Sequence, residues 1–155
     1  MNKIQNITAY LCVNYPIQSE LSKARLTKMV YLADWFSSLV NDKQLTDIEW
    51  VFNHYGPYVD DVIDSISRSR KNFIIKHERN IYGSEKNTIS FIGDIEDIGL
   101  TRNERQILDV VINKTKGLYF NDFIEYIYST YPIRNRTRYS VLDLPRLARE
   151  YSRLN

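Results

Sequence analysis

One segment of the chain, from Ser19 to about Val40, carries apolar residues around most of the circumference of a helix. The main stripe repeats at intervals of three and four residues, the period of an α-helix. Its members are Leu26, Met29, Val30, Ala33, Phe36 and Val40, and Leu32, Trp35 and Leu39 widen it. A helix that is apolar over so much of its girth is usually the central one of its domain. We therefore expect a fold built around this segment, with Ser19 as its N-cap.

Further helices and strands are indicated on both sides of this segment. Thr101 and Glu104 have the spacing of a capping box, and Pro145 suits the first turn of a last helix with Leu147, Tyr151 and Leu154 inward. Helices are predicted at about 3–13, from Pro57 onward, at 101–115, at 121–131 up to Pro132, and from Pro145. Strands are predicted at 48–52, 72–78, 87–92 and 138–144, and their pairing stays open.

These elements define a fold class. The chain has 155 residues, a length that suits one domain and can bury a real core. We predict an α+β protein, mainly α: a single compact domain over residues 1–155, with about six helices and a small antiparallel sheet.

The stretch FNHYGPYVDDV, residues 52–62, admits three interpretations: a reactive site, the start of a helix, or a surface for a partner. Pro57 fits the first position of a helix, and Gly56 can adopt an unusual turn geometry. Asp60 and Asp61 would then lie near the helix N-terminus, where negative charge is favoured. A helix start does not explain the three aromatic residues crowded into the same turn, which are Phe52, Tyr55 and Tyr58.

The residue types present give little support to catalysis or metal binding. The chain has two histidines, His54 and His77, and one cysteine, Cys12, whereas a metal site needs three or four converging ligands. No nucleophile motif or phosphate-binding glycine motif occurs. We predict a protein that is not an enzyme and holds no metal or cofactor, with Cys12 as a small buried side chain. A hydrolase using His54, Asp60 and Asp61 is the weaker alternative.

Charge is distributed unevenly along the chain. Residues 1–64 carry 5 Lys and Arg against 8 Asp and Glu, and the remainder carries 16 against 11. The basic tail contains Arg134, Arg136, Arg138, Arg146, Arg149 and Arg153. One alternative is therefore a nucleic-acid-binding transcriptional regulator that uses helices 101–115 and 121–131 as a helix-turn-helix-like pair. A solvated face is the simpler interpretation of these arginines, so nucleic acid is not the expected partner.

Two motifs resemble a known family. The run KARLTKMVYLADW (23–35) and the run WVFNHYGPYVDDV (50–62) are similar to the Panacea domain of SocA-like bacterial and phage antitoxins. Leu26, Lys28, Met29, Tyr31 and Ala33 match the helix pattern of that family, and Trp50, Tyr55, Gly56 and Pro57 match its aromatic-Gly-Pro step. The resemblance extends over about residues 4–132.

The resemblance implies an antitoxin of the bacterial or phage cytoplasm. Its partner would be a protein toxin encoded by a neighbouring gene, neutralised by direct binding, with delivery of the toxin to a protease as a second route. The N-terminus has no signal-peptide layout, and no apolar run approaches the roughly 20 residues that span a bilayer, so no membrane contact is expected. The predicted partner-binding surface comprises Asp34, Trp35, Trp50, His54, Tyr55, Gly56, Pro57, Tyr58, Asp60 and Asp61. Whether Trp35 and Trp50 lie in the core or on the surface stays open.

Overall fold

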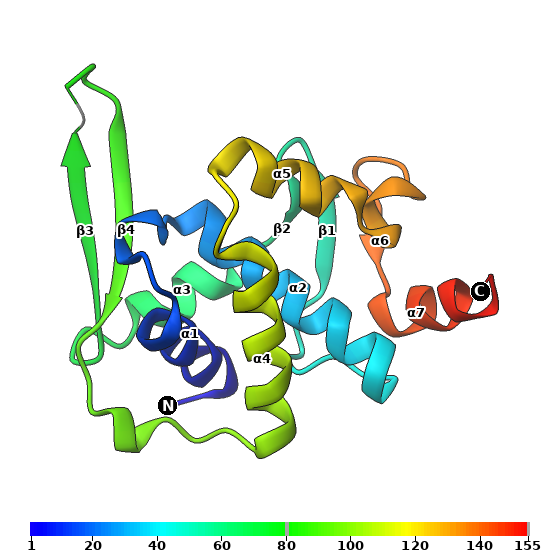
Figure 1. The fold of residues 1–155 in the computed structure, drawn as a ribbon, viewed down its shortest axis with the longest axis horizontal. Helices are drawn as coiled ribbons and strands as arrows, with labels where there is room; N and C mark the ends of the chain where they lie inside the picture. The colour runs from blue at the N-terminus through cyan, green and yellow to red at the C-terminus, as the bar shows by residue number, and fades with distance from the viewer. Residues whose placement is uncertain (80, 155) are drawn as a thin grey trace.

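The computed structural model describes residues 1–79 and 81–154, and it contains seven α-helices and five strands in that range (Figure 1). The helices are α1 (Lys3–Asn14), α2 (Lys23–Asn41), α3 (Asp61–Ser67), α4 (Arg102–Thr115), α5 (Phe120–Ser129), α6 (Tyr131–Arg134) and α7 (Leu144–Arg153). The strands are β1 (Trp50–Asn53), β2 (Gly56–Tyr58), β3 (Phe73–Arg79), β4 (Glu85–Phe91) and β5 (Val141–Leu142). Short 3-10 helices, η1 (Gln18–Glu20) and η2 (Ile95–Asp97), complete the chain. The predicted class, a mainly helical α+β domain, is confirmed.

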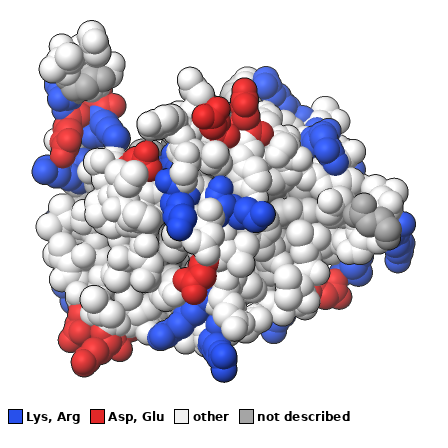
Figure 2. Space-filling model, in the orientation of Figure 1, with Lys and Arg blue, Asp and Glu red and all other residues white. Residues whose placement is uncertain are grey.

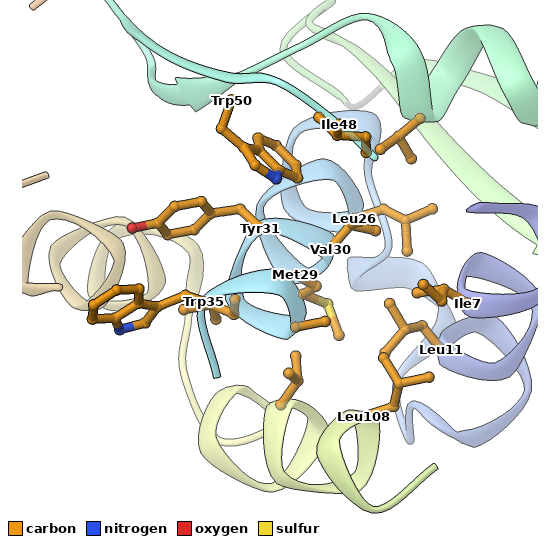
Figure 3. Packing of buried hydrophobic residues seen from close by; sticks show 14 of the residues in the cluster. Ile7, Leu11, Leu26, Met29, Val30, Tyr31, Trp35, Ile48, Trp50 and Leu108 are labelled. Atoms are coloured by element: carbon orange, nitrogen blue, oxygen red, sulfur yellow. The ribbon is translucent and has the colours of Figure 1, made fainter. Parts of the chain in front are cut away.

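Helix α2 is the centre of the molecule, as its apolar girth predicts. It contacts α1, α3, α4, α5, α7, β2 and β4. Figure 3 shows Ile7 and Leu11 of α1 and Leu108 of α4 meeting Leu26 and Met29 of α2, while Trp50 of β1 covers another side of the same helix. All of these side chains are buried. Burial of large apolar side chains contributes roughly 1.5–3 kcal/mol each, so this helix organises most of the core.

The strands form two separate antiparallel sheets. Strand β1 lies between β2 and β5, and β3 pairs with β4 to form a hairpin that projects from one end of the molecule (Figure 1). The sequence predicted the regions of β1, β3, β4 and β5 but not β2, and it left the pairing open. The first sheet has only short strands, so its position depends on how β1 packs against α2.

Several predicted boundaries are wrong, for local reasons. Helix α2 is capped by Ser22, whose Oγ accepts a hydrogen bond from the amide of Arg25 at 3.1 Å, rather than by Ser19. Thr130 adopts an extended backbone and ends α5, so Pro132 lies inside the short helix α6 instead of stopping its predecessor. Leu154 is exposed, whereas Leu147 is buried as predicted.

Other predictions from local sequence are confirmed. The Thr101–Glu104 capping box forms at the start of α4, with each side chain bonded to the other residue's backbone amide. Cys12 is a buried thiol in the core. Among the helices of the described residues, none is long and apolar enough to cross a membrane.

Candidate functional site

The FNHYGPY segment forms a β-hairpin, and the predicted helix start at Pro57 is wrong. Phe52 pairs with Pro57, and His54 and Tyr55 form the turn. Gly56 has φ +88°, a conformation that glycine adopts without steric cost, and the Asn53 side chain accepts a hydrogen bond from the Tyr55 amide at 2.8 Å. Because β2 is an edge strand, the missing amide of Pro57 leaves no sheet hydrogen bond unmade. Helix α3 begins only at Asp61.

The side chain of Asp34 joins α2 to the β1–β2 hairpin through hydrogen bonds in the core. Its carboxylate accepts hydrogen bonds from the amides of Leu45 and Thr46 at 2.9 and 3.0 Å, and from the Trp50 indole at 2.8 Å. The Thr46 hydroxyl donates to it at 2.5 Å. Asp34 is fully buried, so these donors replace the water that an ionised carboxylate needs. The carboxylate therefore holds the connection between α2 and β1 in place.

The predicted surface residues divide between core and surface. Asp34, Trp35 and Trp50 are buried, which places both tryptophans in the core and leaves them no direct access to a partner. Trp50 packs edge-on against Tyr31, and Trp35 stacks on Tyr131. Asp34 and Trp50 therefore support the hairpin from the core, whereas Trp35 packs against Tyr131 and Tyr151, which do not line the groove. Gly56 and Pro57 are also buried and shape the hairpin.

Most of the predicted residues that reach the surface meet at a cavity of about 630 Å³, which we call the aromatic groove. Its lining residues come from the N-terminal half of α2, from the start and first turn of α3, from α5 and from the β1–β2 hairpin. Its lining residues are Lys23, Ala24, Thr27, Lys28, His54, Tyr55, Tyr58, Asp60, Ile63, Asp64, Phe120, Ile124 and Tyr128. Four residues of the predicted surface, His54, Tyr55, Tyr58 and Asp60, thus lie together here.

Aromatic side chains dominate the rim of the groove. Tyr55 is 71% exposed and Phe120 is 48% exposed, while Tyr58 donates a hydrogen bond to Asp60 at 2.9 Å. Tyr139 approaches the outer side of the hairpin, where its hydroxyl lies 2.6 Å from His54 Nε2. His54 therefore bonds to a phenol on a neighbouring loop rather than to a carboxylate that could orient it for catalysis.

Asp61 lies apart from the other predicted site residues. It belongs to the first turn of α3 and lines a different hollow together with Asn2, Lys3 and Asp47. The adjacent Asp60 faces the aromatic groove. The two carboxylates thus point into separate environments, as their adjacency in sequence predicts.

The sequence reasoning missed two buried cations of α2, Arg25 and Lys28, and the α5 wall of the groove. Arg25 donates to the Tyr15 hydroxyl and to the carbonyls of Thr115 and Leu118 at 2.7–2.8 Å. Lys28 is 2% exposed, and burial lowers its pKa to about 8. A signal for both was available: a helix that is apolar around its whole girth leaves few solvent-facing positions, so charged residues within it must be buried.

The basic tail gathers in space at α7. Arg136, Arg146, Arg149 and Arg153 line one hollow together with Glu150. Arg136 pairs with Glu150, and Arg149 pairs with Asp42, so two of these guanidinium groups are already neutralised. On the face seen in Figure 2, Lys and Arg side chains are interspersed with Asp and Glu. The positive charge is therefore less continuous than the basic surface typical of nucleic-acid-binding proteins.

The described residues are 1–79 and 81–154. No cluster of three His, Cys, Asp or Glu side chains in this range could hold a metal ion.

Comparison with protein families identifies the chain. The family model described as "Antitoxin SocA-like, Panacea domain" matches residues 26–132, more than half of the sequence. Searches of curated proteins and of solved structures return no significant match. The matched range includes α2 from Leu26 onward, the β1–β2 hairpin, α3 and α5, which supply most of the lining of the aromatic groove. The chain therefore belongs to the SocA-like antitoxin family and contains its Panacea domain.

Proposed function

We propose that this protein is the antitoxin of a toxin–antitoxin pair and that it neutralises its toxin by binding it at the aromatic groove. The observation that carries this proposal is the exposure of Tyr55 and Phe120, which both line the aromatic groove. Large aromatic side chains that stay exposed on a rigid scaffold are typical anchors of protein interfaces. Direct binding needs no catalytic group, so the protein acts without catalysing a reaction.

The hairpin is suited to present such anchors. Its turn is fixed by Gly56, by the Asn53 side chain and by the contact between Tyr139 and His54. An anchor that is already ordered loses less conformational entropy when its partner binds. Tyr55 therefore contributes more to affinity here than the same side chain would on a mobile loop.

Co-expression with the product of the adjacent gene tests this function. The neighbouring protein alone is expected to arrest growth, and the wild-type antitoxin is expected to restore it. The double variant Tyr55→Ala/Phe120→Ala is expected to fail, because truncating each interface anchor typically costs about 2 kcal/mol or more in binding. Both side chains are exposed, so the variant should keep the unfolding midpoint of the wild-type protein.

A matched control separates loss of the groove from loss of exposed apolar surface in general. Ile95 in η2 and Val40 at the end of α2 are exposed and lie outside the groove. The double variant Ile95→Ala/Val40→Ala should therefore protect cells as well as the wild-type protein does. Equal protection by both double variants would refute the groove as the binding site. If the adjacent product is harmless, or stays toxic beside the wild-type protein, the antitoxin function itself is wrong.

Toxin turnover distinguishes direct neutralisation from delivery to a protease. Under direct binding, the toxin persists in cells as a stable complex with this protein. Under the adaptor route, its half-life falls when this protein is present. A pulse-chase measurement of the toxin, with and without the antitoxin, decides between the two routes.

A further inference from the structure

Lys28 occupies an unusual position in the lining of the aromatic groove. It lies in the middle of α2, it is 2% exposed, and its side chain lines the groove. Among residues 1–79 and 81–154, its ammonium group has no hydrogen-bond or ion-pair partner, and it keeps a small contact with solvent in the groove. Burial alone lowers its pKa to about 8. An ammonium group without a protein partner, on a side chain that is almost wholly buried, is costly, and the described residues offer nothing that compensates it.

Arg25, one turn earlier on α2, shows how this chain compensates a buried cation when the cation is structural. Its guanidinium donates three hydrogen bonds, to Tyr15, Thr115 and Leu118, and it lies 4.5 Å from the centre of the Phe123 ring, although its Nε has no acceptor among the described residues. Lys28 has no equivalent set of partners. The contrast indicates that the partner of Lys28 comes from outside the chain.

The walls around Lys28 define the chemistry of that partner. Ala24, Ile63, Phe120 and Ile124 supply apolar surface. Asp60 and Asp64 also line the groove, from the side of α3. Their negative charge opposes a multiply charged anion such as a phosphate group, whereas a single carboxylate meets less repulsion. A carboxylate on a short apolar stem matches both the buried cation and the apolar walls.

We propose that the aromatic groove receives an Asp or Glu side chain of the toxin, whose carboxylate pairs with the ammonium group of Lys28. Apolar residues beside that acidic side chain pack against Phe120 and Ile124. The groove volume of about 630 Å³ accommodates several side chains, so the acidic residue enters together with its neighbours. This inference rests on the proposed function and adds the chemical identity of the group that the antitoxin recognises.

Titration calorimetry with the purified product of the adjacent gene tests the inference. Lys28→Met removes the charge and keeps the length of the side chain. It is expected to weaken binding by about thirtyfold or more, since it would leave a buried carboxylate unpaired in the complex. The same variant is expected to unfold at a temperature equal to or above that of the wild-type protein, because it removes an uncompensated buried charge. Lys114→Met, which removes an exposed lysine on α4, is the control and should bind like the wild-type protein.

Substitutions in the toxin identify the source of the carboxylate. Each Asp and Glu is replaced by Asn or Gln, and one substitution is expected to weaken binding to the wild-type antitoxin but not to Lys28→Met. If no side chain behaves in this way and a C-terminal extension of the toxin abolishes binding, the carboxylate is the chain terminus and the inference is overturned. Wild-type binding by a folded Lys28→Met variant also overturns it, while the proposed function survives. Absence of binding to the wild-type protein overturns both.

Discussion

Replacing Asp34 with alanine is expected to lower the free energy of unfolding by roughly 3–5 kcal/mol, because each buried donor left without an acceptor costs about 1–3 kcal/mol. The amides of Leu45 and Thr46 and the indole of Trp50 all lose their acceptor. Denaturant unfolding of the purified variant measures the loss. Asp34→Asn keeps one acceptor oxygen and similar volume, so its loss should be clearly smaller. Equal stability of the alanine variant and the wild-type protein is incompatible with the structural role assigned to Asp34.

The same carboxyl group makes stability depend on pH in a defined direction. Burial raises the pKa of Asp34 from 3.8 to about 6, although hydrogen bonds from Thr46, Trp50 and Leu45 oppose the change. The folded state thus binds this proton more tightly than the unfolded state does. The resulting stabilisation is complete below about pH 4 and is lost as the pH rises through about 6.

Comparison with Asp34→Asn isolates this titration, because the variant lacks the ionisable group. As the pH rises from about 4 to about 7, the wild-type protein is expected to lose stability relative to Asp34→Asn. Denaturant unfolding at several pH values in this window measures the difference. A constant difference would show that the pKa of Asp34 is not raised.

Replacing Arg25 with methionine is expected to destabilise the protein by roughly 2–4 kcal/mol, because buried acceptors lose a charged donor while the volume of the side chain is kept. Arg25 donates to the carbonyl of Thr115 at the end of α4 and to that of Leu118 before α5. Two helices that are distant in sequence from α2 are therefore joined to it through one side chain. Denaturant unfolding of Arg25→Met measures the effect.

Arg25→Lys provides the control, since it keeps a charged donor but is shorter and lacks the planar guanidinium that lies over the Phe123 ring. It should recover only part of the lost stability. Because α5 forms one wall of the aromatic groove, Arg25→Met is also expected to weaken neutralisation in cells. Wild-type stability of the methionine variant would show that this bridge contributes nothing to the fold.

The central helix and the strand regions could be predicted because their signals are local and periodic. The apolar stripe of α2 identifies the core element, and the pairing of Thr101 with Glu104 marks the start of α4 within a few residues of sequence. The pairing of the strands could not be predicted, because β1 joins β5 across almost ninety residues of chain. Only the three-dimensional packing around α2 determines that register.

The Gly56–Pro57 step shows why local chemistry can favour the wrong element. A proline after a glycine suits the start of a helix and equally suits an edge strand that follows a tight turn. In the structure, Gly56 has a left-handed φ and Phe52 pairs with Pro57, so the segment is a hairpin. This difference matters for the site. His54 and Tyr55 form the turn of the hairpin, whereas a helix starting at Pro57 would place them in a connecting loop.

The candidate site was predictable in part. The crowding of Tyr55 and Tyr58 beside Asp60 indicated one region of the surface, and all three residues line the groove. Phe120 and Tyr128 come from a helix more than sixty residues away, and nothing in their local sequence links them to the hairpin. The sequence left open whether Trp35 and Trp50 lie in the core or on the surface. In the structure both are buried, and the Trp50 indole donates a hydrogen bond to Asp34.

The most direct test of the central claim is the affinity of the purified antitoxin for the product of the adjacent gene, measured by titration calorimetry. The wild-type protein is expected to bind, and Tyr55→Ala/Phe120→Ala is expected to lose more than about a hundredfold in affinity, given the usual contribution of two interface anchors. The Ile95→Ala/Val40→Ala control should retain wild-type affinity. Unchanged affinity of the groove variant would contradict the claim that the toxin binds at the aromatic groove.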